Sequence, residues 1–165
     1  MEYDDLVKQL KLPASWSPPA TLAYEDIRAS AINRDHLDDD VRGINASLDL
    51  IPRTRGGDWP TEPVTPEFNY VDLVWHECEF REGYSFTYAV HDAGGRYLGC
   101  CYLYPMGRRT PLTEELVQYD VDVSWWVTPD AYRSGYYTKL YAALRRWNET
   151  VFPFWRSYYS NAEIP

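Results

Sequence analysis

The chain has 165 residues, 45% of them hydrophobic and 25% charged, with a formal net charge of −9. This length and composition predict one globular domain over residues 1–165, with residues 1–20 as a peripheral segment. The negative charge disfavours nucleic-acid partners and mildly favours cationic ligands such as amines. No apolar run reaches the roughly 18 residues of a membrane span, and the three cysteines have no disulfide framework, so we expect a cytoplasmic protein.

The first half of the chain predicts a strand, a helix and a loop. Residues 21–32 alternate well enough for a first strand, although a helix is an alternative. Residues 34–51 predict one helix, because their apolar side chains recur at helical spacing: Leu37, Val41, Ile44 and Leu48. The Gly-Gly pair and the prolines of residues 52–63 exclude regular structure there.

A second helix should begin near Thr65, which is a suitable N-cap followed by Pro66 at the first helical position. One face of this helix carries four apolar side chains, and we expect that face to be the buried one: Val71, Val74, Trp75 and Cys78. Residues 84–92 and 96–105 then predict a hairpin through an Ala-Gly-Gly turn.

The last third of the chain predicts a strand, a turn, a helix and a final strand. Residues 118–128 alternate apolar and polar side chains over the strand period. The following helix has a buried stripe of Tyr137, Leu140, Tyr141, Leu144 and Trp147. Residues 152–159 form the final predicted strand, and the whole order indicates an α/β or α+β domain.

Three pieces of the second half resemble the GNAT superfamily of N-acetyltransferases: the hairpin FTYAVHDAGGRYLGCCYLYP, the strand YDVDVSWWVTP and the turn YRSGYYTKL. The similarity extends roughly from Tyr24 to Ala162, and NYVDLVWHECEF and WNETVFPFWRSYY resemble a branch without an assigned substrate. The resemblance implies an α/β (α+β) domain with a mixed, mostly antiparallel sheet flanked by helices and shortened at the C-terminus. It also implies acetyl transfer from acetyl-CoA to a small-molecule amine or another amino group.

In that superfamily the amides of a strand-to-helix turn bind the diphosphate of acetyl-CoA at the positive end of the helix. The resemblance places the cofactor on Val127, Arg133, Ser134, Gly135, Tyr136, Tyr137 and Thr138. Asn161 would contact the pantetheine arm or only form a turn. Arg108 and Arg109 would meet the 3′-phosphate of the cofactor or only solvate a loop.

The resemblance also implies catalytic roles, with the amine attacking the thioester directly. Asp122 is the expected base, since it aligns with an acidic position of the superfamily and shares a strand face with Asp120, which would raise its pKa. Tyr159 is the expected acid and Tyr158 the second choice. Surface carboxylates and core tyrosines are the alternatives.

The turn departs from the superfamily pattern, because tyrosines stand where small residues are usual: Tyr136 or Tyr137. A second function therefore stays open, a GNAT-like module that binds a small molecule or a protein without catalysis. An uncovered sheet edge would invite pairing with a second copy, which makes a homodimer an expected assembly. No metal site is expected, since Phe80 stands where the second histidine of an H-E-x-x-H motif would be needed after His76.

Overall fold

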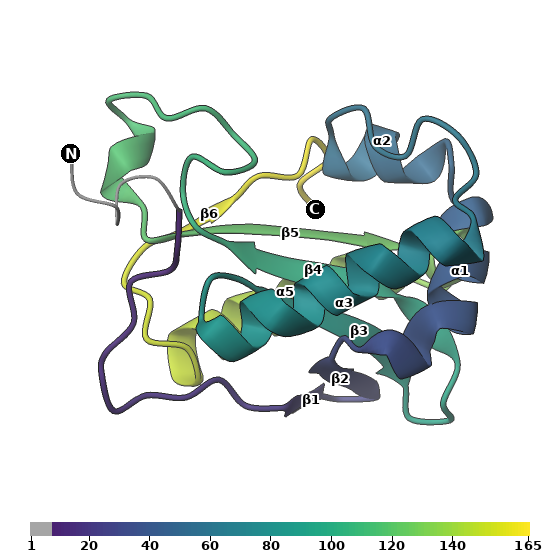
Figure 1. Ribbon diagram of the computed structural model, residues 1–165, viewed down its shortest axis with the longest axis horizontal. Helices are drawn as coiled ribbons and strands as arrows, with labels where there is room; N and C mark the ends of the chain where they lie inside the picture. Colours follow the sequence, from purple (N-terminus) through teal and green to yellow (C-terminus); the bar gives the residue numbers. More distant parts are fainter. Residues whose placement is uncertain (1–7) are drawn as a thin grey trace.

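Residues 8–165 are described by a computed structural model with one sheet of six strands in the order β1-β2-β3-β4-β5-β6 (Figure 1). The strands are β1 (Thr21–Tyr24), β2 (Ile27–Ala31), β3 (Phe86–Asp92), β4 (Tyr97–Tyr104), β5 (Val121–Val127) and β6 (Ser157–Tyr159). All neighbours pair antiparallel except β5 and β6, which are parallel. This arrangement confirms the mixed, mostly antiparallel sheet.

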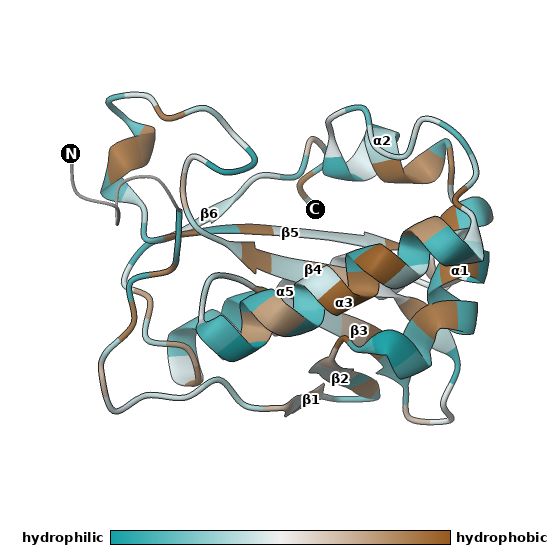
Figure 2. Cartoon of the chain, viewed as in Figure 1, coloured by the Kyte–Doolittle hydropathy of each residue, from teal (hydrophilic) through white to brown (hydrophobic). Residues whose placement is uncertain are grey.

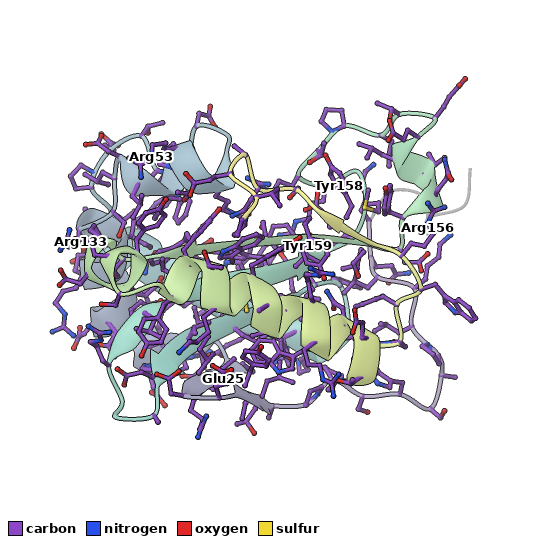
Figure 3. All side chains as sticks on the ribbon, turned by 180° about the vertical axis from the view of Figure 1, so that it is seen from behind. Glu25, Arg53, Arg133, Arg156, Tyr158 and Tyr159 are labelled. Atoms are coloured by element: carbon purple, nitrogen blue, oxygen red, sulfur yellow. The ribbon has the colours of Figure 1, made fainter. Side chains whose placement is uncertain are left out.

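Helices cover both faces of the sheet. On one face lie α1 (Leu37–Asn45), α2 (Leu50–Arg55) and α3 (Pro66–Glu82). Two further helices, α4 (Pro129–Arg133) and α5 (Tyr136–Thr150), come after β5 in the chain. The back view shows α5 across the other face (Figure 3). One core, around Trp125, lies between the sheet and α5, and a second, around Trp126, lies under α1 and α3. None of the helices within residues 8–165 is long and apolar enough to cross a bilayer.

The first predicted strand and the first predicted helix are both interrupted. Residues 21–32 contain a hairpin, in which Leu22 pairs with Ala29 and Glu25 takes a left-handed conformation with φ 50°. Residues 34–51 contain a short 3-10 turn, α1 and only the start of α2 instead of one helix. α2 continues to Arg55, so the prediction that residues 52–63 lack regular structure is wrong for their first turn. The helical spacing continues across the break because Ile44 and Ile51 pack in the same core.

The elements of the second half follow the sequence prediction closely. The predicted stripe of α5 is buried, with Tyr141 half-buried at its side. The final strand is shorter than predicted and covers only Ser157–Tyr159. Its predicted first part is irregular because the carboxylate of Asp120 accepts the N–H groups of Trp155 and Arg156.

The N-terminal segment predicted to be peripheral reaches the core where the structure describes it. Leu10 is buried, and the ring of Trp16 packs on Phe86 and Phe152 with centroid distances of 6.0 and 5.8 Å. Residues 1–7 lie outside the described residues.

The predicted buried face of α3 is wrong. Phe68, Val71 and Trp75 are 67, 68 and 65% exposed, and brown hydrophobic residues recur along this outward-lying helix in Figure 2. The residues of α3 that are buried are instead largely polar: Asn69, Leu73, His76 and Glu79.

The polar side of α3 can be buried because each polar group meets a partner from another element. Asn69 Nδ2 donates to Asp40 Oδ2 of α1 at 2.8 Å. His76 Nδ1 lies 3.1 Å from Thr87 Oγ1 of β3. Glu79 accepts hydrogen bonds from Ser85 and Arg108. The apolar side of the helix is consequently left in contact with solvent.

This orientation predicts unequal effects on stability for two substitutions on α3. Leu73→Ala removes a side chain with no exposed area and should lower the free energy of unfolding by about 2–5 kcal/mol. Val71→Ala should change it by less than about 0.5 kcal/mol, since Val71 lies in water. Urea denaturation of both variants checks this, and a larger loss for Val71→Ala would contradict the orientation.

Candidate functional site

The connection between β5 and α5 contains a tight helical turn and a glycine. Thr128 Oγ1 accepts the N–H of Ala131 at 3.3 Å and begins α4. Gly135 then adopts φ 87°, a left-handed conformation that favours glycine, and α5 starts in a new direction. A Cβ added at Gly135 would meet no atom within 4 Å, so the space beside the turn is open.

The first amides of α5 lack partners within residues 8–165. The N–H groups of Ser134 and Gly135 donate to Asp130 O and Tyr132 O at 3.1 Å, and the next bonded amide is that of Lys139, which donates to Gly135 O at 3.2 Å. No side chain caps the helix. The N–H groups of Tyr136, Tyr137 and Thr138 are therefore free donors at the positive end of the helix dipole, which is where an anion binds.

The two tyrosine rings of this turn extend to different sides. The Tyr136 hydroxyl donates to Asp26 in the β1–β2 turn. The Tyr137 ring packs on Trp125 at 5.1 Å, and its hydroxyl reaches the carbonyls of Thr54 and Glu163. Both hydroxyls are therefore bonded to groups other than the three free amides.

The outer edge of β5 is paired only in part. β6 covers it from Val121 to Val123. Beyond that point Asn161 Oδ1 accepts the Trp125 N–H at 3.1 Å, and Asn161 Nδ2 donates to Trp125 O and the Tyr137 hydroxyl at 2.9 and 2.8 Å. Asn161 therefore bridges the chain to itself, and its contact with a pantetheine arm stays a prediction.

Val127 lies next along the same edge and leaves its backbone groups unpaired. Hydrogen bonding alternates along an antiparallel strand, and Thr128 N already donates inward to Leu98 O at 2.8 Å. The N–H and C=O of Val127 consequently point outward, like those of Trp125. Neither the N–H nor the C=O of Val127 has a hydrogen-bond partner among residues 8–165, although only 1% of the surface of Val127 is exposed. A buried, unpaired edge of this kind calls for a polar ligand.

The arginines of the predicted cofactor contacts are engaged inside the chain. Arg133 is exposed at the end of the molecule that also carries Arg53, and it pairs with Asp130 (Figure 3). Arg108 pairs with Glu79 through both terminal nitrogens. Arg109 donates only to neutral oxygens, those of Ser160 and the carbonyls of residues 55 and 56.

Asp122 is fully buried on the face of the sheet that carries α1 and α3. Thr110 Oγ1 donates to its carboxylate at 3.2 Å, and so does Ser160 Oγ. Burial raises the pKa of Asp122, while the Ser160 hydrogen bond and the charge of Arg109 act against that rise. The cause is therefore desolvation and not Asp120, whose carboxylate binds the backbone of Trp155 and Arg156.

Tyr159 lies on the opposite face. Its ring packs edge-on against Tyr141 of α5 at 5.3 Å, and its hydroxyl accepts from Asn148 Nδ2 at 3.2 Å. Successive side chains of a strand point to opposite faces, and Asp122 pairs with Tyr158, one residue earlier. The structure thus separates Asp122 and Tyr159 by the thickness of the sheet, and Tyr158 packs on Tyr119.

A pocket of about 370 Å³ opens on the face of Asp122. It takes its walls from α2, the loop after α2, α3, β4 and the loop after β4, with Arg55, Trp59, His76, Tyr102, Tyr104 and Arg109 among its lining residues. The sequence interpretation identified only Arg109 of these six as a ligand contact. The one available signal was the alternation of Tyr102 and Tyr104, which places both rings on one face of a strand.

No group of three or more His, Cys, Asp or Glu residues in the described part of the chain could hold a metal ion. Cys100 and Cys101 are buried, and burial raises the pKa of both thiols. Thiols in such surroundings are poor nucleophiles.

The buried Asp122 predicts a pH-dependent effect of Asp122→Asn on stability. A raised folded-state pKa means that the folded protein loses stability as pH rises from the unfolded pKa, near 4, through the folded value. Asparagine does not titrate, so the melting temperature of the variant relative to wild type should rise by a few degrees between about pH 4 and pH 8. Calorimetry across this range checks it, and a falling difference would contradict it.

No protein-family model matches the chain, and no curated protein is similar to it in sequence. Its fold is nevertheless shared with solved acetyltransferases. RimL, a ribosomal α-N-protein acetyltransferase in complex with coenzyme A, matches with a TM-score of 0.57 and 12% identity over 78% of this chain and 66% of that one. An acetyltransferase from Salmonella typhimurium that modifies the N-terminal serine of a 50S ribosomal subunit protein matches with a TM-score of 0.57 and 9% identity, covering 78% and 67%.

A chimera of the spermidine N-acetyltransferase SpeG from Vibrio cholerae with hSSAT matches with a TM-score of 0.54 and 13% identity, covering 77% of this chain and 65% of that one. The chain thus spans about two thirds of the length of these structures. At this identity the likeness concerns the fold, and the chain has the GNAT fold of these N-acetyltransferases.

Proposed function

We propose that the protein is an acyl-CoA-dependent N-acetyltransferase that moves acetyl from acetyl-CoA to an amine by direct attack. The observation that carries this proposal is two sets of unpaired backbone groups on either side of α4. They comprise the N–H and C=O of Val127 on the outer edge of β5 and the first three N–H groups of α5.

These groups fit the chemistry of coenzyme A. Free amides at a helix N-terminus suit a diphosphate, and an open strand edge suits the amides of a pantetheine arm. A structural neighbour with the same fold, RimL, is in complex with coenzyme A. Acetyl-CoA supplies an activated acetyl group, and the chain contributes chiefly by holding it beside an acceptor amine, since proximity lowers the barrier substantially.

Asp122 is the proposed base for the acceptor ammonium. Its pKa is raised by burial, which brings a carboxyl closer to the range useful for proton transfer. Arg109 lines the pocket on this face and carries the charge that acts on Asp122. The acceptor would therefore approach from the pocket, on the side of the sheet opposite Tyr159.

A second function is favoured by the C-terminal residues. The side chain of Asn161 is hydrogen-bonded to the backbone N–H and C=O of Trp125. The N–H groups of Ala162 and Glu163 donate to Arg55 O and Thr54 O at 3.2 and 2.9 Å. A chain whose C-terminal residues close part of the β5 edge and bind the end of α2 would bind a ligand at the turn without catalysing transfer. Cofactor binding without thiol release across a panel of amines would select this alternative.

The acceptor class, the compartment and the assembly are further parts of the proposal. Acetyltransferases with this fold include one that acts on spermidine and others that act on ribosomal proteins. We propose a small-molecule amine or an amino group as the acceptor, a cytoplasmic location and a homodimer.

The free amides of α5 predict the effect of a charge at Thr138. Thr138→Asp should leave the melting temperature unchanged or higher, since an acidic residue in the first turn complements the helix dipole. The same charge should repel a diphosphate and weaken coenzyme A binding about tenfold. Isothermal titration calorimetry measures this, with the exposed Ser17→Asp as a control of equal charge. No heat from wild type at millimolar coenzyme A would end the proposal.

The separation of Asp122 and Tyr159 predicts unequal kinetic effects. Asp122→Asn should lower kcat by about 10²-fold or more and remove the lower pKa from the pH–rate profile, if Asp122 takes the proton. Tyr159→Phe should have a much smaller effect, since the Tyr159 hydroxyl lies on the other face and already accepts from Asn148. Thiol release from acetyl-CoA with a good amine acceptor reports both, and a dominant effect of Tyr159→Phe would contradict this geometry.

A further inference from the structure

Arg55 is a buried arginine at the end of α2 that lines the pocket of about 370 Å³. The whole residue is 8% exposed. Its Nε donates to Ser124 Oγ of β5 at 3.1 Å, which fixes the side chain over the strand. Its guanidinium carbon lies 4.0 Å from the centroid of the Tyr102 ring and 5.9 Å from that of Trp59. The planar group is thus held in one orientation on an aromatic floor.

The two terminal nitrogens of Arg55 have no hydrogen-bond partner among residues 8–165. No carboxylate of these residues lies within 4.0 Å of the guanidinium, although the chain as a whole is strongly acidic. The charge of Arg55 does act on Asp122: burial raises the pKa of Asp122, and the charges of Arg109 and Arg55 oppose that rise. The oxygens of Asp122, however, accept from Ser160 and Thr110 and not from Arg55. An arginine whose terminal nitrogens have no partner normally finds one. The pocket is the place from which a partner can reach them.

The neighbouring charges increase the need for an anion. Arg109 lines the same pocket and donates only to neutral oxygens. Burial lowers the pKa of Arg109, and the charge of Arg55 lowers it further. Arg108, the third arginine of the pocket, is already paired with Glu79. The two carboxylates that line the pocket, Asp58 and Asp72, approach neither Arg55 nor Arg109 within 4.0 Å, and Asp72 instead faces His76 Nε2 at 3.3 Å.

The shape of the free group selects the kind of anion. With Nε bonded to Ser124, the open edge of the guanidinium is the one formed by its two terminal nitrogens, which matches the two oxygens of a planar carboxylate. A phosphate dianion would bring two further oxygens toward a pocket that already holds Asp58 and Asp72.

We infer that Arg55 is the anchor of a carboxylate-binding subsite, and that the acceptor of this protein is an amine that also carries a carboxylate, such as an amino acid or a peptide with a free C-terminus. The subsite itself stands on the pocket alone. Its assignment to the acceptor rests on the proposed acetyl transfer, and is supported by the position of Arg55 over β5, the strand whose outer edge would hold the cofactor.

The first test uses the wild-type protein without coenzyme A. Leucine, glutamate and the dipeptide Ala-Ala are each compared with the corresponding C-terminal amide, with the fluorescence of Trp59 and Trp75 in the pocket and calorimetry as readouts. Each acid should bind at least about tenfold more tightly than its amide, since a charge-assisted bidentate contact is lost in the amide. The comparison of leucine with Ala-Ala separates a free amino acid from a peptide terminus as the source of the carboxylate.

The second test changes the anchor. Arg55→Lys keeps the positive charge but lacks the two terminal nitrogens of the guanidinium group, so it should weaken binding of the acids about tenfold. Arg55→Gln should abolish the preference for acid over amide. Arg53→Gln, on the same helix but outside this pocket, should leave the preference unchanged. Circular dichroism confirms folding of each variant.

Equal binding of acid and amide to wild type would overturn the inference, whether or not the variants fold. Binding that persists in a folded Arg55→Gln protein would overturn it as well, as would no binding of any acid at millimolar concentration. Failure of coenzyme A to bind while the acids still bind through Arg55 would reject the acetyltransferase proposal and leave the subsite standing.

Discussion

The end of the pairing between β5 and β6 is the constraint on which the candidate site depends. After Val123 the outer edge of β5 still carries backbone groups that must find partners, because they are buried. Asn161 satisfies those of Trp125, while those of Val127 remain open beside the free amides of α5. The chain itself thus pairs the outer edge of β5 at Trp125 and leaves this edge open to a ligand at Val127.

Burial of polar groups shapes the opposite side of the sheet. α3 faces the sheet with Asn69, His76 and Glu79, because α1, β3 and the loop after β4 supply their partners. The same face holds Arg55, which lacks such a partner at its terminal nitrogens. An acidic protein thus carries a pocket with two arginines, Arg55 and Arg109, that donate to no carboxylate among residues 8–165, and the net charge of the chain does not reveal such a local arrangement.

Much of the second half of the chain could be predicted from local patterns. The strand of residues 118–128 and the stripe of α5 were correct because alternation and helical spacing are properties of neighbouring residues. The hairpin at Glu25 and the break between α1 and α2 were missed, since neither has a glycine or proline at its turn and both helices continue one apolar pattern. The side of α3 that is buried was mispredicted, because its partners are distant in the sequence.

The sequence alone determined that a glycine-bearing turn links an alternating strand to a long helix, and that Asp122 and Tyr159 lie on the strands before and after that helix. Only the tertiary structure decided that these two side chains lie on opposite faces, and that Arg55 lies over Ser124. The physical reason is that alternation determines which residues of one strand lie on the same face. It does not determine which residues of a second strand lie on that face with them. That depends on register and on parallel or antiparallel pairing, which are set by contacts between residues far apart in the chain.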